Sequence, residues 1–493
     1  MLDSSTTPTL APVRTGNAPD AAGTTLVISL LLVSAFVVIL NETIMGVALP
    51  HLMTDLNITA SAAQWLTTAY MLTMAVVIPI TGFLLERFNT RPVFLAAMSL
   101  FSTGTLIAAI APGFEVLIVG RVVQATGTAI MMPLLMTTVM TLVAPAARGK
   151  TMGNISIVIS VAPAIGPTIS GLILSVLDWR WMFILVLPIA LGALALGAAR
   201  IKNVSVPAKV PLDVVSVILS AFGFGGLVYG LSNLGEAAGG VAGLIPLGVG
   251  VGAIALFVWR QLVLQRSDRA LLDLRTFVSP TFTLSIVMLA LSMMAMFGTL
   301  ILLPIYTQTV LGLDVLSTGL LLLPGGLTMG LLAPFVGRFY DRFGPTVLLV
   351  PGSIIVSGAF WFMTLLTATT PVWWVLLAHV ALSFGLAFLF TPLFTAGLAS
   401  LKPKLYSHGS AVVGTAQQLA GAAGTALFIT VMSSTAAGRL ADGAGDIAAT
   451  ATGIQAAFMY GAIISVFAIP LAFFIRRPAV SVTDERQVPI AAH

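Results

Sequence analysis

The chain consists of apolar runs of about 20 residues separated by short polar or Gly/Pro-rich turns, and a run of that length is what a helix needs to cross a bilayer. Of the 493 residues, 58% are hydrophobic and only 8% are charged. So few charges cannot cover the surface of a soluble protein of this size. We therefore expect an all-α integral membrane protein.

Fourteen apolar runs can be distinguished, and each predicts one membrane-spanning helix. Residues 1–23 predict a flexible tail and not a signal peptide, because the apolar run that follows is too long and lacks a basic leader. The predicted spans are residues 24–50, 61–85, 92–112, 115–142, 151–177, 181–199, 213–233, 241–260, 281–305, 316–337, 346–368, 372–398, 410–435 and 454–475.

One short charged segment occurs twice. Gly82-Phe-Leu-Leu-Glu-Arg-Phe-Asn-Thr-Arg91 is matched 255 positions later by Gly337-Arg-Phe-Tyr-Asp-Arg-Phe-Gly-Pro-Thr346. The copies follow the second and the tenth predicted span, which indicates two equivalent bundles of six helices around an insertion of two helices. Duplicated bundles are typical of transporters. The expected units are a tail at 1–23, a bundle at 24–199, a linker with two extra helices at 200–280, a bundle at 281–475 and a tail at 476–493.

The basic residues predict the orientation. With both termini in the cytoplasm, 19 of the 22 lysines and arginines fall on the cytoplasmic side, while Arg180 and Arg439 fall outside and Arg121 lies within a span. This asymmetry follows the positive-inside rule. The basic balance therefore concerns topology and lipid head groups and does not indicate nucleic-acid binding. We expect a multi-pass protein of the cell membrane.

Three ionisable residues lie deep within predicted spans: Glu42, Arg121 and His379. Burying one of them costs at least about 2.5–3.5 kcal/mol, so each needs a compensating partner or a function. Glu42 and Arg121 are expected at similar depths, about 12 and 9 Å below the outer surface. They are candidates for proton coupling, and the alternative is a static ion pair that orients two helices. For His379, a hydrogen-bonded interior histidine is the alternative to a role in proton transfer.

These motifs resemble those of the major facilitator superfamily, in its fourteen-span branch of drug/proton antiporters. The segment at 82–91 is similar to the loop motif G-x-L-x-D-R-x-G-R-R/K, with Glu86 in place of the aspartate. Residues 40–50 resemble the first-helix motif L-D-x-T-I-V-N-V-A-L-P, with Asn41 where the family has aspartate, so we assign the proton-carrying role to Glu42. Residues 121–127 resemble the fourth-helix motif R-x-x-Q-G-x-G, and residues 162–171 resemble the antiporter motif of the fifth helix.

Eight residues are predicted to gate the pathway or to hold its structure. Ala162, Gly166 and Ser170 are spaced four apart, so they share one helix face and admit a close neighbour. Pro167 can bend that helix. The acid and arginine of each repeated segment are expected to pair with each other as a weak latch, the alternative being simple anchoring at the membrane surface. The predicted gating set is Gly82, Glu86, Arg87, Arg91, Gly166, Pro167, Asp341 and Arg342.

Polar and methionine side chains on apolar spans predict a ligand cavity. Methionines offer adaptable apolar contacts, and a few polar groups suit varied hydrophobic ligands, including cations near Glu42. Helix packing or lipid contact is the alternative for each residue. The candidates for substrate binding are Asn41, Tyr70, Gln124, Met132, Asn154, Tyr306, Gln308 and Gln417.

The sequence favours proton-coupled efflux of small hydrophobic or amphipathic compounds, such as drugs, by alternating access. A proton-coupled symporter that imports a small metabolite is the alternative. The chain has no cysteine and no constellation of nucleophile and base, so an enzyme is not expected. A channel or sensor would not explain the duplication. We expect no cofactor and no metal, and the expected partners are the substrate, protons and lipid, with one chain as the functional unit.

Overall fold

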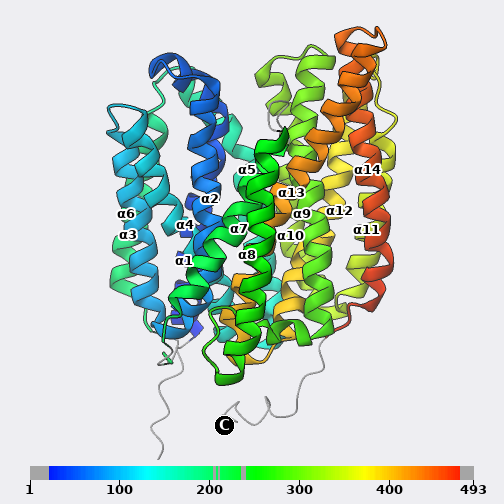
Figure 1. Cartoon of the computed structure of the whole chain (residues 1–493). Coiled ribbons are helices and arrows are strands. Elements are labelled where there is room, and N and C mark those ends of the chain that lie inside the picture. Colours follow the sequence, from blue (N-terminus) through cyan, green and yellow to red (C-terminus); the bar gives the residue numbers. More distant parts are fainter. Residues whose placement is uncertain (1–20, 204–206, 209–210, 235–239, 478–493) are drawn as a thin grey trace, which may run out of the picture.

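The computed structural model describes residues 21–203, 207–208, 211–234 and 240–477, and within this part it consists of helices joined by short turns, without β-strands (Figure 1). Fourteen helices are long and apolar enough to cross a membrane. Their bounds are α1 Ala21–Asp55, α2 Ala60–Arg87, α3 Thr90–Ala109, α4 Phe114–Leu142, α5 Arg148–Leu174, α6 Trp181–Arg200, α7 Val214–Leu234, α8 Gly240–Leu264, α9 Pro280–Ile305, α10 Val315–Phe343, α11 Thr346–Met363, α12 Val372–Ala399, α13 Tyr406–Ala441 and α14 Asp446–Phe474.

The helices form two bundles of six, α1–α6 and α9–α14, which confirms the predicted fold class. Helices α7 and α8 pack on each other, and α7 also contacts α2 of the first bundle and α13 of the second. In Figure 1 this pair runs in front of the seam between the bundles. The ring of Tyr229 on α7 lies 5.8 Å from that of Trp65 on α2, so aromatic packing holds α7 against the first bundle.

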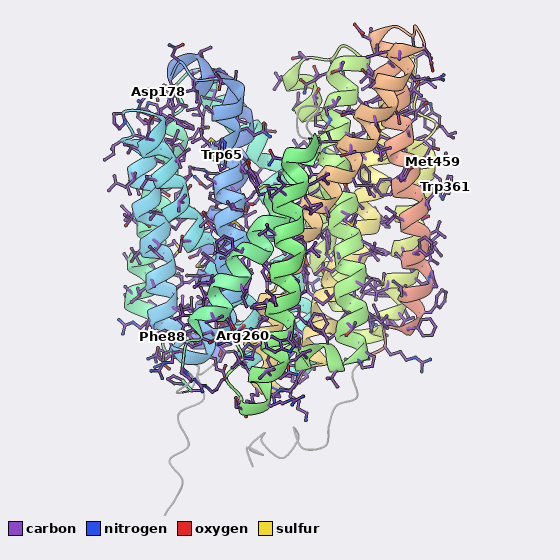
Figure 2. All side chains as sticks on the ribbon, viewed as in Figure 1. Trp65, Phe88, Asp178, Arg260, Trp361 and Met459 are labelled. Carbon is purple, nitrogen blue, oxygen red and sulfur yellow. The ribbon has the colours of Figure 1, made fainter. Side chains whose placement is uncertain are left out.

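The alternating direction of the helices places both ends of the described chain at one end of the molecule. We call this end the base; it carries the turns at 87–90, 143–147, 265–279, 343–346 and 399–405. We call the opposite end the mouth; it carries the turns at 56–59, 110–113, 175–180 and 364–371. In Figure 2, Phe88 and Arg260 lie near the base and Asp178 lies near the mouth.

Small residues let neighbouring helices approach closely, both within a bundle and in the inserted pair. A Cβ added to Gly120 of α4 would lie 2.9 Å from the backbone nitrogen of Ala108 on α3, and one added to Gly226 of α7 would lie 2.9 Å from Cα of Gly250 on α8. Such close backbone approach is how helices gain packing energy where lipid removes the usual hydrophobic driving force. Large apolar side chains point outward, including Trp361 on α11, which is 43% exposed (Figure 2). That surface suits contact with lipid.

Several helix ends differ from the sequence prediction. Helix α13 begins at Tyr406 and ends at Ala441, against a predicted 410–435, and α14 begins at Asp446, against 454. The polar start of α13 is buried against other helices, and the first turns of α14 are rich in Ala and Thr, so hydropathy alone does not mark either end. Local chemistry sets other ends: Thr59 caps α2 by accepting a hydrogen bond from the backbone of Ala62, and Gly344, with a φ of 84°, ends α10.

Candidate functional site

A cavity of about 240 Å³ lies between the two bundles at mid-depth. Its walls come from α1, α2, α4 and α5 of the first bundle and from α9, α10, α12 and α13 of the second. Most lining residues are apolar, and none of them is a lysine or an arginine. Its methionines are Met74, Met132, Met293, Met296 and Met329. Its polar side chains are those of Glu42, Thr43, Thr128, Ser160, Thr168, Thr299, His379, Ser383, Gln417 and Gln418.

Only part of the predicted binding set lines this cavity. Met132 and Gln417 are among its lining residues, as is Glu42, which was predicted for proton coupling. The other candidates are not. Three of them, Asn41, Tyr70 and Gln124, are fully buried in a polar network beside the cavity.

The last three candidates lie farther away. Tyr306, also fully buried, donates its hydroxyl to the carbonyl oxygen of Thr367 at 2.6 Å, in the π-helical turn Tyr306–Val310 near the mouth. Gln308 is exposed in the same turn, and Asn154 lies on the base half of α5. None of the three is a lining residue.

The buried network is centred on Arg121 of α4. Its Nη1 donates to Oε1 of Gln124 at 2.8 Å and to Oδ1 of Asn41 at 3.3 Å. The guanidinium lies 4.0 Å from the centroid of the Tyr70 ring, a cation–π contact. The hydroxyl of Tyr70 in turn donates to Thr128 at 2.7 Å, and Thr128 lines the cavity. Arg121 therefore joins α1, α2 and α4 through hydrogen bonds and one aromatic ring.

Glu42 and Arg121 are close enough for their charges to interact, as expected, but no direct ion pair joins them among the described residues. Consecutive residues on an α-helix point about 100° apart. Asn41 faces α4 and meets Arg121, whereas Glu42 faces the cavity. The carboxylate is thus placed where a solute in the cavity can reach it.

The second repeated segment binds the first bundle at the base. The carboxylate of Asp341 on α10 accepts hydrogen bonds from the backbone N–H groups of Gly149 and Lys150, both at 2.8 Å. These groups start α5, where unpaired N–H groups and the helix dipole favour a negative charge. The expected pair of Asp341 with Arg342 is therefore wrong. A Cβ on Gly149 would lie 2.6 Å from the carbonyl oxygen of Gly337, so glycine is needed for the two helices to meet.

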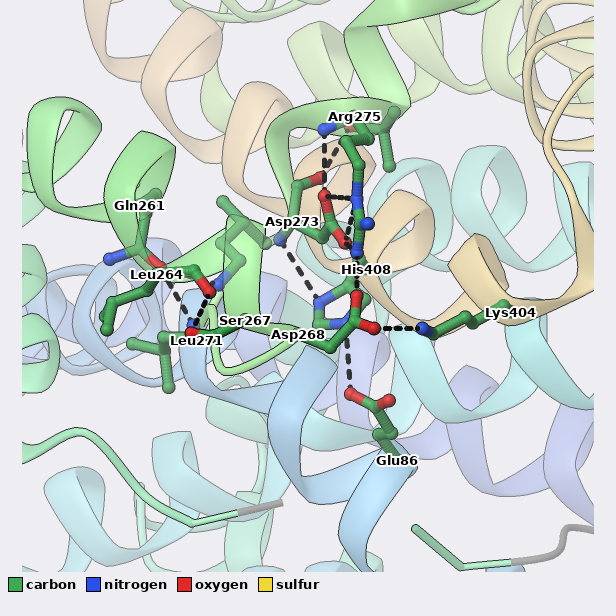
Figure 3. Close-up of polar contacts among 12 residues, drawn as sticks. Glu86, Gln261, Leu264, Ser267, Asp268, Leu271, Asp273, Arg275, Lys404 and His408 are labelled. Atoms are coloured by element: carbon green, nitrogen blue, oxygen red, sulfur yellow. Dashed lines mark hydrogen bonds and ion pairs between the residues drawn. The ribbon is translucent and has the colours of Figure 1, made fainter. Parts of the chain in front are cut away.

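The first repeated segment makes a matching contact with the second bundle. Oε2 of Glu86 on α2 lies 3.1 Å from Nε2 of His408 on α13, and the backbone N–H of Asp273 lies 3.4 Å from Nδ1 of the same ring (Figure 3). Because Asp273 donates to Nδ1, the ring proton is on Nε2 and is donated to Glu86. The expected pairing of Glu86 with Arg87 is wrong as well. A Cβ on Gly82 would lie 3.1 Å from Nδ1, so this glycine leaves room for the imidazole.

Charged residues of the α8–α9 connection complete this contact. We call the set Glu86, Asp268, Asp273, Arg275, Lys404 and His408 the base clasp (Figure 3). Arg275 donates to Asp268 and to Asp273, both at 2.5 Å, and Nζ of Lys404 lies 3.1 Å from Asp268. Hydrogen bonds from Arg275 and Lys404 lower the pKa of the Asp268 carboxyl. The connection is thereby tied directly to the second bundle, and it reaches Glu86 of the first bundle only through His408.

The predicted small-residue face of α5 packs against α1. Gly166 packs against Thr43 of α1, and in the same face Ser170 donates to the carbonyl oxygen of Ile44 at 2.9 Å, so α1 is the close neighbour of this face of α5. The helix continues through position 167, but the Pro167 side chain lies outside the described residues.

The described contacts of Arg91 and Arg342 stay within their own bundles. Arg91 donates to the carbonyl oxygen of Ala198 at 2.7 Å, within the first bundle. Arg87 is half-buried as the last residue of α2. The guanidinium of Arg342 lies 5.0 Å from the ring of Phe343.

Sequence reasoning missed the clasp residues His408 and Asp273, as well as the position of His379 on the cavity wall. His408 is 322 positions from Glu86, so no local pattern connects them. The one available signal was Gly82, whose absent side chain makes room for the histidine. No group of three or more His, Asp or Glu side chains that could hold a metal occurs in the described part of the chain.

Comparison with known proteins identifies the family. The model of the Major Facilitator Superfamily matches residues 31–425. The lincomycin resistance protein LmrB of Listeria monocytogenes is 42% identical over 457 residues, which cover 92% of this chain and 96% of the relative. A multidrug resistance protein B homolog of Mycobacterium tuberculosis is 30% identical over 395 residues, covering 79% and 72%.

Solved structures agree on the fold. The human organic anion transporter MFSD10 superposes with a TM-score of 0.65 at 16% identity, over 91% of this chain and 99% of that one. The proton:xylose symporter XylE gives 0.60 at 14% identity, over 93% and 97%. The family match and the curated relatives show that the protein is a membrane transporter and not an enzyme. It belongs to the major facilitator superfamily, and its fourteen candidate spans fit the fourteen-span branch of drug/proton antiporters.

Proposed function

We propose that this transporter exports small hydrophobic or amphipathic compounds, cations among them, in exchange for protons. The observation that carries the proposal is the central cavity, which has methionine-rich walls and one carboxylate, Glu42, without a lysine or arginine in its lining. Such a cavity attracts a cation electrostatically and adapts to varied apolar shapes. The relatives named for resistance to lincomycin and to multiple drugs support the direction of transport.

The base is proposed to face the cytoplasm. The basic residues that set the predicted orientation, such as Arg91, Lys150 and Lys404, lie on this end of the helices. In that orientation the bundles are joined on the cytoplasmic side by the base clasp and by the contact of Asp341 with α5. Export then requires these contacts to open, admit a substrate from the cell and close again.

Glu42 is the proposed proton carrier. A proton and a cationic substrate compete for the same carboxylate, so protonation from outside displaces the substrate and deprotonation inside allows the next one to bind. For an uncharged substrate, one proton that moves inward down a potential of 100 mV releases about 2.3 kcal/mol. Exchange of one proton for a monovalent cation moves no net charge, so the proton concentration gradient must then drive it. A tenfold concentration ratio costs about 1.4 kcal/mol. A single coupled proton at 100 mV therefore suffices for a more than tenfold concentration ratio of an uncharged substrate across the membrane. Both bundles are in one chain, so a monomer contains the whole pathway.

Efflux from cells that lack their own drug pumps tests the proposal. Expression is expected to lower accumulation of a cationic dye, and an uncoupler is expected to abolish the difference. Glu42→Gln should also abolish it, whereas Glu115→Gln, which changes an exposed acid near the mouth, should not. Dye accumulation that rises above the level of empty cells would favour the importing symporter. Efflux by Glu42→Gln at the wild-type rate and with wild-type pH dependence would refute the role of this carboxylate.

A further inference from the structure

His379 of α12 is the one histidine among the lining residues, and it lies on the second bundle, whereas Glu42 lies on the first. It belongs to a continuous lining face of α12, since Leu382, Ser383 and Leu386, which follow at helical spacing, also line the cavity. The cavity thus has an ionisable group on each of the two bodies that must move relative to each other in an alternating-access cycle.

The contacts of the ring fix its tautomer. Nε2 of His379 lies 3.1 Å from the carbonyl oxygen of Leu322 on α10. A carbonyl oxygen only accepts, so Nε2 carries the proton and the neutral ring leaves Nδ1 with a free lone pair. Nδ1 is buried and has no hydrogen-bond partner in the described part of the chain. An unsatisfied buried acceptor is unfavourable, and a ligand that donates to it removes that cost.

Helix α10 is shaped to hold this ring. The Nε2–Cδ2 edge of the imidazole rests against Gly325, where an added Cβ would overlap both atoms. The opposite edge, which carries Nδ1, therefore points away from α10. Gly325 follows Pro324, whose missing N–H loosens the helix at this level. A bulky residue at 325 would displace the imidazole, so the position of the ring is built into the packing of two helices.

From this geometry we propose that His379 is the substrate-recognition residue of the second bundle and that it accepts a hydrogen bond from an N–H or O–H group of the transported molecule. The inference rests on the proposed function and extends it, because it specifies the substrate class. A preferred substrate has an apolar body, a cationic group that faces Glu42 and a hydrogen-bond donor that faces His379. Such a molecule bridges the two bundles and is held by both.

Two related dyes test the proposal with the full-length protein in lipid nanodiscs. Rhodamine 123 carries N–H groups, whereas tetramethylrhodamine methyl ester has a similar cationic ring system with fully methylated nitrogens. Binding is measured by fluorescence anisotropy. His379→Leu is expected to weaken binding of rhodamine 123 about tenfold, equivalent to about 1.4 kcal/mol, and to leave binding of the methylated dye unchanged. His379→Gln, which keeps an acceptor, should retain most of the affinity for rhodamine 123.

The outcome separates recognition from packing. If His379→Leu weakens both dyes equally, or neither, the proposal is overturned. Gly325→Ala, which displaces the ring without removing it, should reproduce the selective loss. Failure of this inference is distinguishable from failure of the proposed function, since uncoupler-sensitive efflux of both dyes by the unchanged protein tests the function alone, whatever the affinities of the His379 variants.

Discussion

The contact of Glu86 with His408 is predicted to hold the base closed, and removing it should raise the population of molecules with an open base. The two side chains meet at 3.1 Å, with 18% and 5% of their surfaces exposed. A hydrogen bond to a charged group stabilises by about 1.5–3 kcal/mol. Because Glu86 is partly exposed, we take the lower value of about 1.5 kcal/mol. This corresponds to a rise of about tenfold in the open population for Glu86→Ala.

The assay uses a cysteine accessibility reporter, and the chain has no cysteine of its own. Ala411 of α13 is fully buried at the base beside Gly82 of α2, so Ala411→Cys should react with a thiol reagent only when the bundles separate there. The rate of labelling then reports the open population. Glu86→Ala should label about ten times faster than the parent. Glu115→Ala, an exposed site near the mouth, is the matched control and should label at the parent rate.

A double-mutant cycle isolates the pair from its surroundings. His408→Ala should act more strongly than Glu86→Ala, because it also removes the contact with the backbone of Asp273. Once His408 is replaced, Glu86→Ala should add little. The expected coupling energy is about 1.5 kcal/mol. Strictly additive effects, or labelling rates that none of the three variants changes, would refute the clasp as a closing contact.

Three further outcomes are expected. Asp341→Asn should also speed labelling at the Ala411→Cys reporter, by about threefold to tenfold, because the N–H groups at the start of α5 lose their contact with a negative charge on α10. An unchanged rate would contradict this. Gly166→Ala should lower the melting temperature, since overpacking against α1 costs about 1–3 kcal/mol, while Gly171→Ala, where a Cβ meets nothing within 4 Å, should not; equal melting temperatures would contradict the close packing. Arg121→Met should lower dye efflux strongly with normal expression, because Asn41 loses its donor, and normal efflux would argue against the buried network.

Hydropathy was sufficient for the fold because the bilayer imposes a length on every span. Fourteen apolar runs became fourteen helices, and the repeated segments at 82–91 and 337–346 gave the duplication of the bundles. The predicted helix bounds were wrong where a helix end is polar. The first turn of α13, which includes Tyr406 and His408, is as polar as a loop, yet it is buried because it meets α2. The start of α13 is therefore set by its contact with another helix, and hydropathy along the sequence carries no information about such a contact.

The site was predicted less completely, since a sequence shows which residues are polar but not which face of the helix they occupy. Glu42, Met132 and Gln417 do line the cavity. Tyr70 and Gln124 looked equivalent to them in the sequence, but each has a partner on another helix that draws it away from the cavity: Thr128 for Tyr70 and Thr105 for Gln124. Glu86 and Asp341 were identified from the repeat, but the sequence suggested neighbouring arginines as their partners. Their actual partners lie in the opposite bundle.

Positions 41 and 42 illustrate why one residue of offset matters for the mechanism. The resemblance to the family marks position 41 for an acid, and here Asn41 keeps the contact with Arg121 without a negative charge. Glu42, one step farther along α1, turns the carboxylate into the cavity. The hydrogen bonds of the arginine thus go to neutral partners and its face meets an aromatic ring, and it does not hold the cavity carboxylate in a direct ion pair. A carboxylate without such a competitor is available to a proton or to a cationic substrate, and exchange between those two is what antiport requires.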